Sequence, residues 1–146
     1  MKYMGMPMGM WVLFSGSFQT QLTAYYAKAM MTGPMRWFCR KSGKAKFSAK
    51  DIRGMEATAR LRAADRNPYS WNMDVLPYPD GSGYEARFSK CGICTLMQEL
   101  GLYDLTPAMC RLDYTMAEAG GAANFARQYT LASGGPYCDC GYQKKV

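Results

Sequence analysis

Residues 84–100 read YEARFSKCGICTLMQEL, and the hydrophobic period changes in the middle of this stretch. Tyr84, Ala86 and Phe88 alternate with polar residues, which is typical of a strand that buries one face. From Cys91 onward the apolar residues recur every three or four positions until Gly101, which indicates a short helix that ends at a glycine. A strand followed directly by a helix favours a fold of the α+β class.

Two turns divide the neighbouring sequence into hairpins. Asp80-Gly81-Ser82-Gly83 predicts a turn between a short strand at 76–78 and the strand at 84–89. Residues 125–132 and 138–143 also alternate, and the turn at 133–136 separates them. We therefore expect two antiparallel hairpins.

The remaining segments carry helical signals. Helices are predicted over 8–30, from the cap Ser48 to the stop at Asn67-Pro68, and from the cap Thr106 to about residue 118, while residues 41–44 are predicted to form a loop. These elements predict one α+β domain over residues 1–146. In it, N-terminal helices pack on a small antiparallel sheet with two further helices.

Composition excludes several kinds of chemistry. The chain contains no histidine, so a Ser-His-Asp triad and a Cys-His pair are both excluded. The net charge of +7 arises within residues 36–66, where a solvated surface is favoured over a nucleic-acid site because no nucleic-acid motif is present. We predict no signal peptide and no membrane segment, since the apolar runs are short. A cytoplasmic location is therefore expected, with cysteines that are free thiols, metal ligands or reactive groups.

The first candidate site combines Cys110 and Asp113. On the helix predicted after Pro107, Asp113 falls within the apolar stripe and Cys110 lies one turn earlier. A carboxylate on a buried face must be paired, hydrogen-bonded or protonated, so this pair marks either a functional site or a structural ion pair. Arg127, on an otherwise apolar strand face, likewise needs a carboxylate from Asp113, from Glu85 or from a ligand.

The other cysteines form two close pairs. Cys138 and Cys140 share one strand face and are either core residues or cavity thiols. Cys91, in a C-x-x-C pair with Cys94, begins a helix, and a helix N-terminus stabilises a thiolate. If the protein binds zinc, these four thiols are the expected ligands. Their spacing, however, differs from that of the cysteine pairs in common zinc sites. No cofactor is therefore predicted.

The ordered motifs of the last third resemble the L-2-amino-thiazoline-4-carboxylic acid hydrolase family. The matching pieces are Cys91-Gly-Ile-Cys94, Gly101-Leu102, Pro107-x-x-Cys110-x-x-Asp113, and Arg127-x-x-Thr130-Leu131-Ala132-x-Gly134-Gly135-x-x-Cys138-Asp139, all within the motif region 91–142. The chain departs from the family pattern at Cys140, where an aromatic residue is usual.

The resemblance implies a hydrolase that opens a small sulfur- and nitrogen-containing ring, acting on C–N or C–S bonds of a cyclic amidine-like substrate. It implies catalytic roles for Cys110, Asp113, Cys138 and Asp139, and substrate binding by Arg127, Cys91, Tyr129 and Thr130. The expected partner is a small molecule. Two alternatives are a non-catalytic binding module with a cysteine-lined pocket and a zinc-stabilised interaction domain that uses residues 36–66.

Overall fold

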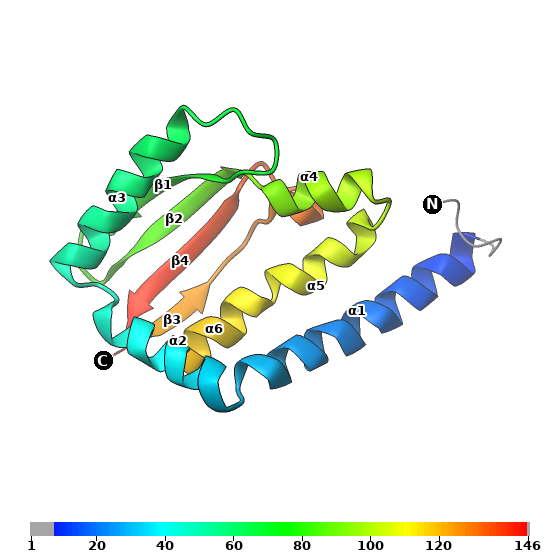
Figure 1. Cartoon of the computed structure of the whole chain (residues 1–146), viewed down its shortest axis with the longest axis horizontal. Coiled ribbons are helices and arrows are strands. Elements are labelled where there is room, and N and C mark those ends of the chain that lie inside the picture. The colour runs from blue at the N-terminus through cyan, green and yellow to red at the C-terminus, as the bar shows by residue number, and fades with distance from the viewer. Residues whose placement is uncertain (1–7, 146) are drawn as a thin grey trace.

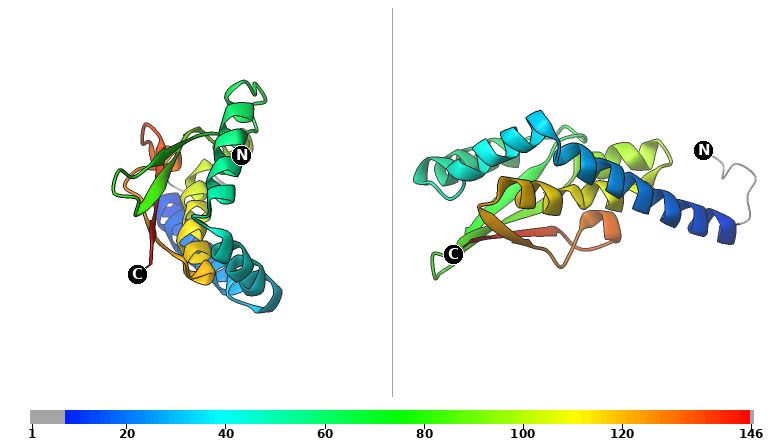
Figure 2. Two further views of the ribbon diagram at one scale, coloured as in Figure 1. Left: turned by 90° about the vertical axis from the view of Figure 1, so that its left-hand side faces the viewer. Right: turned by 90° about the horizontal axis from the view of Figure 1, so that it is seen from below.

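A four-stranded antiparallel sheet with helices on one side forms the fold (Figures 1 and 2). The computed structural model describes the backbone of residues 8–145 and the side chains of residues 16–145. The elements are α1 (Met8–Met30), α2 (Gly33–Ala45), α3 (Ala49–Ala63), β1 (Asn72–Pro77), β2 (Gly83–Lys90), α4 (Gly92–Glu99), η1 (Tyr103–Leu105), α5 (Thr106–Cys110), α6 (Leu112–Gly120), β3 (Ala123–Ala126), η2 (Leu131–Ser133) and β4 (Cys138–Lys144). The predicted α+β class is confirmed.

The strands are arranged in the order β1-β2-β4-β3. β1 and β2 form the first predicted hairpin, closed by a hydrogen bond from the Tyr78 amide to the Gly83 carbonyl. β3 and β4 pair antiparallel, with Phe125 opposite Tyr142. β4 also pairs with β2, which places Cys138 opposite Phe88 and Cys140 opposite Ala86. The last strand of the chain therefore lies inside the sheet.

One face of the sheet forms the core beneath the helices. Tyr84, Ala86 and Cys140 are buried there, and Phe47 and Ile52 from the α3 region pack against them. The alternation predicted for residues 84–89 is confirmed, because its aromatic and apolar residues all face this core. The opposite face carries the polar members of the same strands, including Asp139, which lies opposite Arg87.

Residues 41–44 do not form the predicted loop. They belong to the last turns of α2, which begins at Gly33-Pro34. The helix continues through Gly43 because this residue packs directly on α6 and is buried, so tertiary contact stabilises a sequence that contains few strong helix formers. Within the described part of the chain, no helix is both long enough and apolar enough to cross a bilayer.

The predicted strand at 125–132 is shorter than expected, because β3 ends at Ala126. Beyond that point the backbone amides of Gln128 and Tyr129 donate to the side chain of Asp139 and not to a strand carbonyl. The predicted helix after Thr106 is interrupted at Arg111. There the carbonyl of Cys110 accepts a hydrogen bond from Arg127, whereas a continuous helix would direct it to the amide four residues later.

A close contact between α2 and α6 requires glycine at position 43. A Cβ atom on Gly43 would lie 2.3 Å from the carbonyl oxygen of Gly120. Gly43→Ala is therefore expected to lower the free energy of unfolding by at least about 1 kcal/mol, because the cost of overpacking exceeds the gain in helix propensity. Urea unfolding of the purified variant measures this change.

Gly54→Ala is the matched control for this prediction. Gly54 lies within α3, and an added Cβ meets nothing within 4 Å. This substitution should raise the free energy of unfolding by up to about 1 kcal/mol through helix propensity alone. Equal effects at the two positions would contradict the role given to the α2–α6 contact.

Candidate active site

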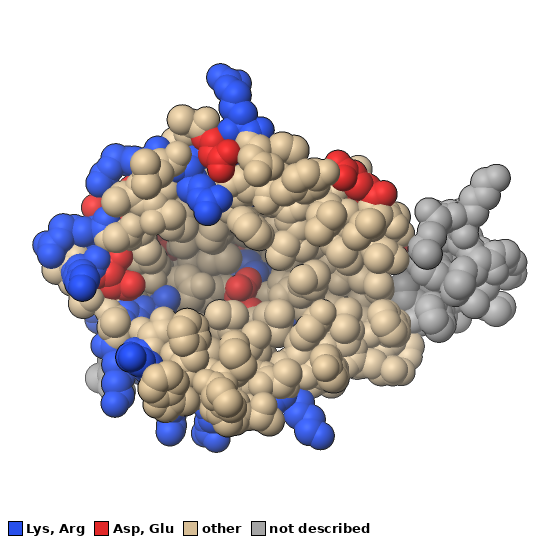
Figure 3. All heavy atoms as spheres, viewed as in Figure 1, with Lys and Arg blue, Asp and Glu red and all other residues tan. Residues whose placement is uncertain are grey.

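Residues from the five elements β2, α4, α5, α6 and β4, and from the segments between elements, line one cavity of about 180 Å³. Of the residues singled out from the sequence, it brings together Cys91, Cys110, Asp113, Arg127 and Cys138. Its other lining residues are Trp71, Phe88, Ile93, Thr106, Met109, Cys140 and Tyr142. The space-filling view shows the helix-bearing face hollowed near its centre, with acidic and basic atoms inside the hollow (Figure 3). Groups that are far apart in the chain thus meet around a shared space.

Arg127 is the most deeply buried charge of the site, with a side chain that is only 6% exposed. Its Nη1 donates to Asp113 Oδ2 at 2.6 Å, and its Nη2 donates to the carbonyl of Cys110 at 2.8 Å. The rings of Tyr114 and Phe125 each lie 5.5 Å from the guanidinium carbon. Burial has the largest single effect and lowers the pKa of Arg127, but Asp113, Cys140 and Cys110 together raise the pKa by more, and the net shift is upward. Arg127 therefore stays charged and holds Asp113 in place.

Asp113 lies in the first turn of α6 and faces the cavity. Burial raises its pKa, and the neighbouring Arg127 only partly opposes this shift. The side chain keeps an exposed fraction of 39% because it borders open space on the side away from Arg127. A carboxylate with a raised pKa accepts a proton more readily than an ordinary aspartate, which suits general-base chemistry.

The cavity thiols are held mainly in the protonated form. Burial raises the pKa of Cys110 to about 11 and that of Cys140 to about 12. Burial also raises the pKa of Cys138, but the Leu131 amide donates to its Sγ at 3.2 Å and opposes the shift. The sulfur of Cys138 thus has a backbone hydrogen-bond donor that favours its thiolate, while Arg127 has the same effect on Cys140 but does not prevent the large upward pKa shift there.

These shifts predict a loss of stability at alkaline pH. Cys110 and Cys140 have higher pKa values in the folded protein than the value of about 8.5 in an unfolded chain, so the folded state keeps their protons longer. The contribution of these two thiols to stability is complete at pH values below their pKa in the unfolded chain. It is lost as the pH rises toward their higher pKa values in the folded protein. Urea unfolding under reducing conditions at about pH 7.5 and about pH 10.5 should show the decrease. The decrease should be smaller in a Cys110→Ala/Cys140→Ala variant, and an equal decrease would contradict the assignment.

Cys91 and Cys94 occupy different positions around α4. Cys91 is the N-cap of the helix and lines the cavity, while Cys94 lies outside the lining. Burial raises the pKa of Cys94 to about 12, with Cys91 adding to the shift. Across residues 16–145, no group of three or more His, Cys, Asp or Glu side chains is arranged to hold a metal ion. No such group is formed by the four thiols that were expected to bind zinc if any is present, Cys91, Cys94, Cys138 and Cys140.

A family profile described as L-2-amino-thiazoline-4-carboxylic acid hydrolase matches residues 17–142. The chain belongs to this family. Every residue that lines the cavity lies within the matched range. Comparison with curated proteins and with solved structures finds no match to this chain.

Three residues that the family resemblance pointed to do not line the cavity of this hydrolase-family member. Asp139 lies on the opposite face of β4, where its carboxylate accepts hydrogen bonds from the amides of Gln128 at 3.0 Å and Tyr129 at 2.6 Å. The Tyr129 ring packs edge-on against Tyr137. The Thr130 hydroxyl accepts from the Ser133 amide at 3.0 Å and caps η2. These contacts order the segment that positions Arg127 and the Leu131 amide.

Thr106 lines the cavity, although the sequence predicts only a helix-capping role for it. It was expected to cap a helix, but it is the first residue of α5, and its side chain makes no capping hydrogen bond. The residue is fully buried, and its Oγ1 has no hydrogen-bond partner among residues 16–145. A buried hydroxyl without a partner is costly. This buried hydroxyl belongs to one of the residues that line the cavity.

Proposed function

We propose that this member of the family hydrolyses a small cyclic substrate of the 2-aminothiazoline-4-carboxylate type and opens its ring. The observation that carries this proposal is the meeting of Cys138, Asp113 and Arg127 in one small cavity. The volume of about 180 Å³ is below the range of roughly 300–1,000 Å³ that drug-sized ligands occupy. A five-membered ring with a few substituents is therefore the appropriate size of ligand.

The reaction begins with the Cys138 sulfur attacking the ring carbon that lies between sulfur and nitrogen. Asp113 takes the proton of the attacking thiol, which is needed because this thiol is protonated at neutral pH. A carbon–sulfur bond forms between Cys138 and the substrate, and the carbon–sulfur bond of the ring breaks. The proton held by Asp113 passes to the departing ring sulfur.

Water completes the reaction. Asp113, again ionised, takes a proton from the water that attacks the same carbon, and the Cys138 sulfur leaves and is reprotonated. The net change is the addition of one water, and the product is an N-carbamoyl cysteine with a free thiol. In a simpler mechanism, Asp113 acts as a general base on water and no covalent intermediate forms. Trapping a covalent adduct on Cys138 would distinguish the covalent mechanism from this one.

A turnover assay tests the proposal. The purified protein is incubated with 2-aminothiazoline-4-carboxylate, and released thiol is followed with a colorimetric thiol reagent after removal of the protein. We expect thiol release together with a product whose mass exceeds that of the substrate by one water. Release no faster than in a protein-free blank would contradict the proposed reaction.

One observation favours the second candidate, a binding module without chemistry. The pKa values of about 11 for Cys110 and about 12 for Cys140 keep both groups as neutral thiols, which also suits a passive pocket. Under that function the same compound should bind in a calorimetric titration and be recovered unchanged.

A further inference from the structure

Lys46 lies at the C-terminal end of α2, within the basic segment that the proposed reaction does not use. Its Nζ lies 3.7 Å from the ring centroid of Tyr142 and 5.3 Å from that of Tyr84. No carboxylate lies within ion-pair distance of Lys46 among residues 16–145. Burial lowers the pKa of Lys46, and the more distant Asp51 only partly opposes this shift. The ammonium group is therefore partly desolvated and lacks a paired anion.

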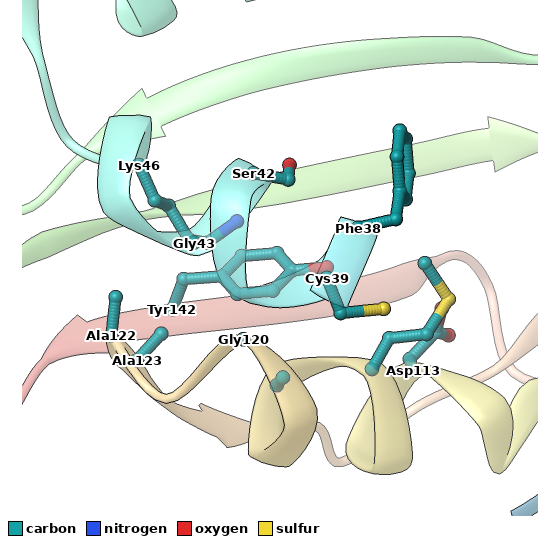
Figure 4. Close-up of a pocket in the computed structure, with 12 residues that line it drawn as sticks. Phe38, Cys39, Ser42, Gly43, Lys46, Asp113, Gly120, Ala122, Ala123 and Tyr142 are labelled. Carbon is teal, nitrogen blue, oxygen red and sulfur yellow. The ribbon is translucent and has the colours of Figure 1, made fainter. Parts of the chain in front are cut away.

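A second cavity, of about 130 Å³, places this ammonium group beside the thiol cavity. Asp113 and Tyr142 line both cavities, so the two spaces adjoin at these side chains. Figure 4 shows Lys46 beside the ring of Tyr142, with Asp113 at the opposite end of the second cavity in this view. Ser42, one turn before Lys46, also lines this space and provides a hydroxyl group.

The charges around the two cavities do not balance. Asp113 and Arg127 form an ion pair and neutralise each other. Asp51, the carboxylate that affects Lys46, is turned to the start of α3, where its Oδ2 accepts the Phe47 amide at 3.2 Å. One positive charge remains at Lys46, and a partly buried, unpaired charge is stabilised when an anion binds it.

We propose that Lys46 forms an anion-binding subsite that receives the carboxylate of the ligand whose ring occupies the thiol cavity. The identity of the ring rests on the proposed function, whereas the charge preference rests on Lys46 itself. Arg127 is the other cation of the site, but its Nη1 and Nη2 already donate to Asp113 and to the carbonyl of Cys110. Arg127 then acts as a positioning residue, and Lys46 supplies the recognition of the carboxylate.

Calorimetric binding of two probes tests this subsite. The probes are 2-aminothiazoline-4-carboxylate and 2-aminothiazoline, which lacks the carboxylate. A charge-assisted contact should make the wild-type protein bind the first probe about 10- to 100-fold more tightly than the second. Lys46→Met should remove this difference and leave the affinity for 2-aminothiazoline unchanged. Lys46→Arg, which keeps the charge, should retain most of the preference and serves as a second variant if Lys46→Met does not fold.

Lys44→Met is the matched control, because it removes the same charge from an exposed position on the same helix and outside both cavities. An unchanged preference in Lys46→Met, or an equal loss in Lys44→Met, would overturn the subsite. Turnover by the wild type without any preference for the carboxylate would overturn the subsite alone. A Lys46-dependent preference without turnover would overturn the hydrolysis alone.

Discussion

Cys138→Ala should abolish the release of thiol from 2-aminothiazoline-4-carboxylate. The sulfur of Cys138 lines the cavity and receives a hydrogen bond from the Leu131 amide, and its removal takes away the one protein atom proposed to form a covalent bond to the substrate. The fold should persist, because replacing sulfur by hydrogen in a partly buried position leaves a small space and creates no unpaired charge. Turnover and circular dichroism, measured on the same preparation, report the two properties separately.

Cys94→Ala is the control for this experiment. Cys94 is also a partly buried free thiol, but it lies outside the cavity lining. It should keep wild-type turnover, and a loss equal to that of Cys138→Ala would show that thiol removal acts through the fold. Alkylation of wild type with a small haloacetamide gives a further check, because bound substrate should protect Cys138 and leave Cys94 unprotected. Undiminished turnover in Cys138→Ala would exclude Cys138 as the nucleophile and leave attack by Cys110, or by water with Asp113 as base.

Asp113→Asn should reduce turnover by a factor of about 10² to 10⁴, the usual contribution of a general base. It should also lower the free energy of unfolding, because Arg127 keeps its charge in a position where its side chain is only 6% exposed. Loss of one member of a buried ion pair costs about 3–5 kcal/mol. We expect the lower end, about 3 kcal/mol, since Asp113 itself is 39% exposed and water partly screens the pair.

The two effects of Asp113→Asn can be separated. Glu118→Gln removes a carboxylate from an exposed position on the same helix and should change neither turnover nor stability appreciably. In an Asp113→Asn/Arg127→Met variant the unpaired cation is gone, so part of the stability should return while turnover stays low. Recovery of turnover in this double variant would mean that Asp113 serves only to neutralise Arg127.

Much of the local structure follows from patterns within short segments. The alternation of Tyr84, Ala86 and Phe88, the cap at Ser48 and the glycine at Gly101 each depend on neighbours a few residues away, and each is found as predicted. The spacing of Cys110 and Asp113 places both on the same side of the α5–α6 segment, where they line the same cavity. Such features are predictable because helix and strand periods are properties of the local backbone.

The amino-acid sequence by itself determined the α+β class, the absence of histidine chemistry and the series of thiols and carboxylates that marks the family. Only the tertiary structure decided which of these groups meet. β4 pairs between β2 and β3, and this arrangement turns Cys138 and Cys140 toward the cavity and Asp139 to the other side. It also brings Lys46 onto the ring of Tyr142. These arrangements depend on burial and on strand pairing between segments far apart in the chain. The hydrophobic period of a single segment therefore does not predict them.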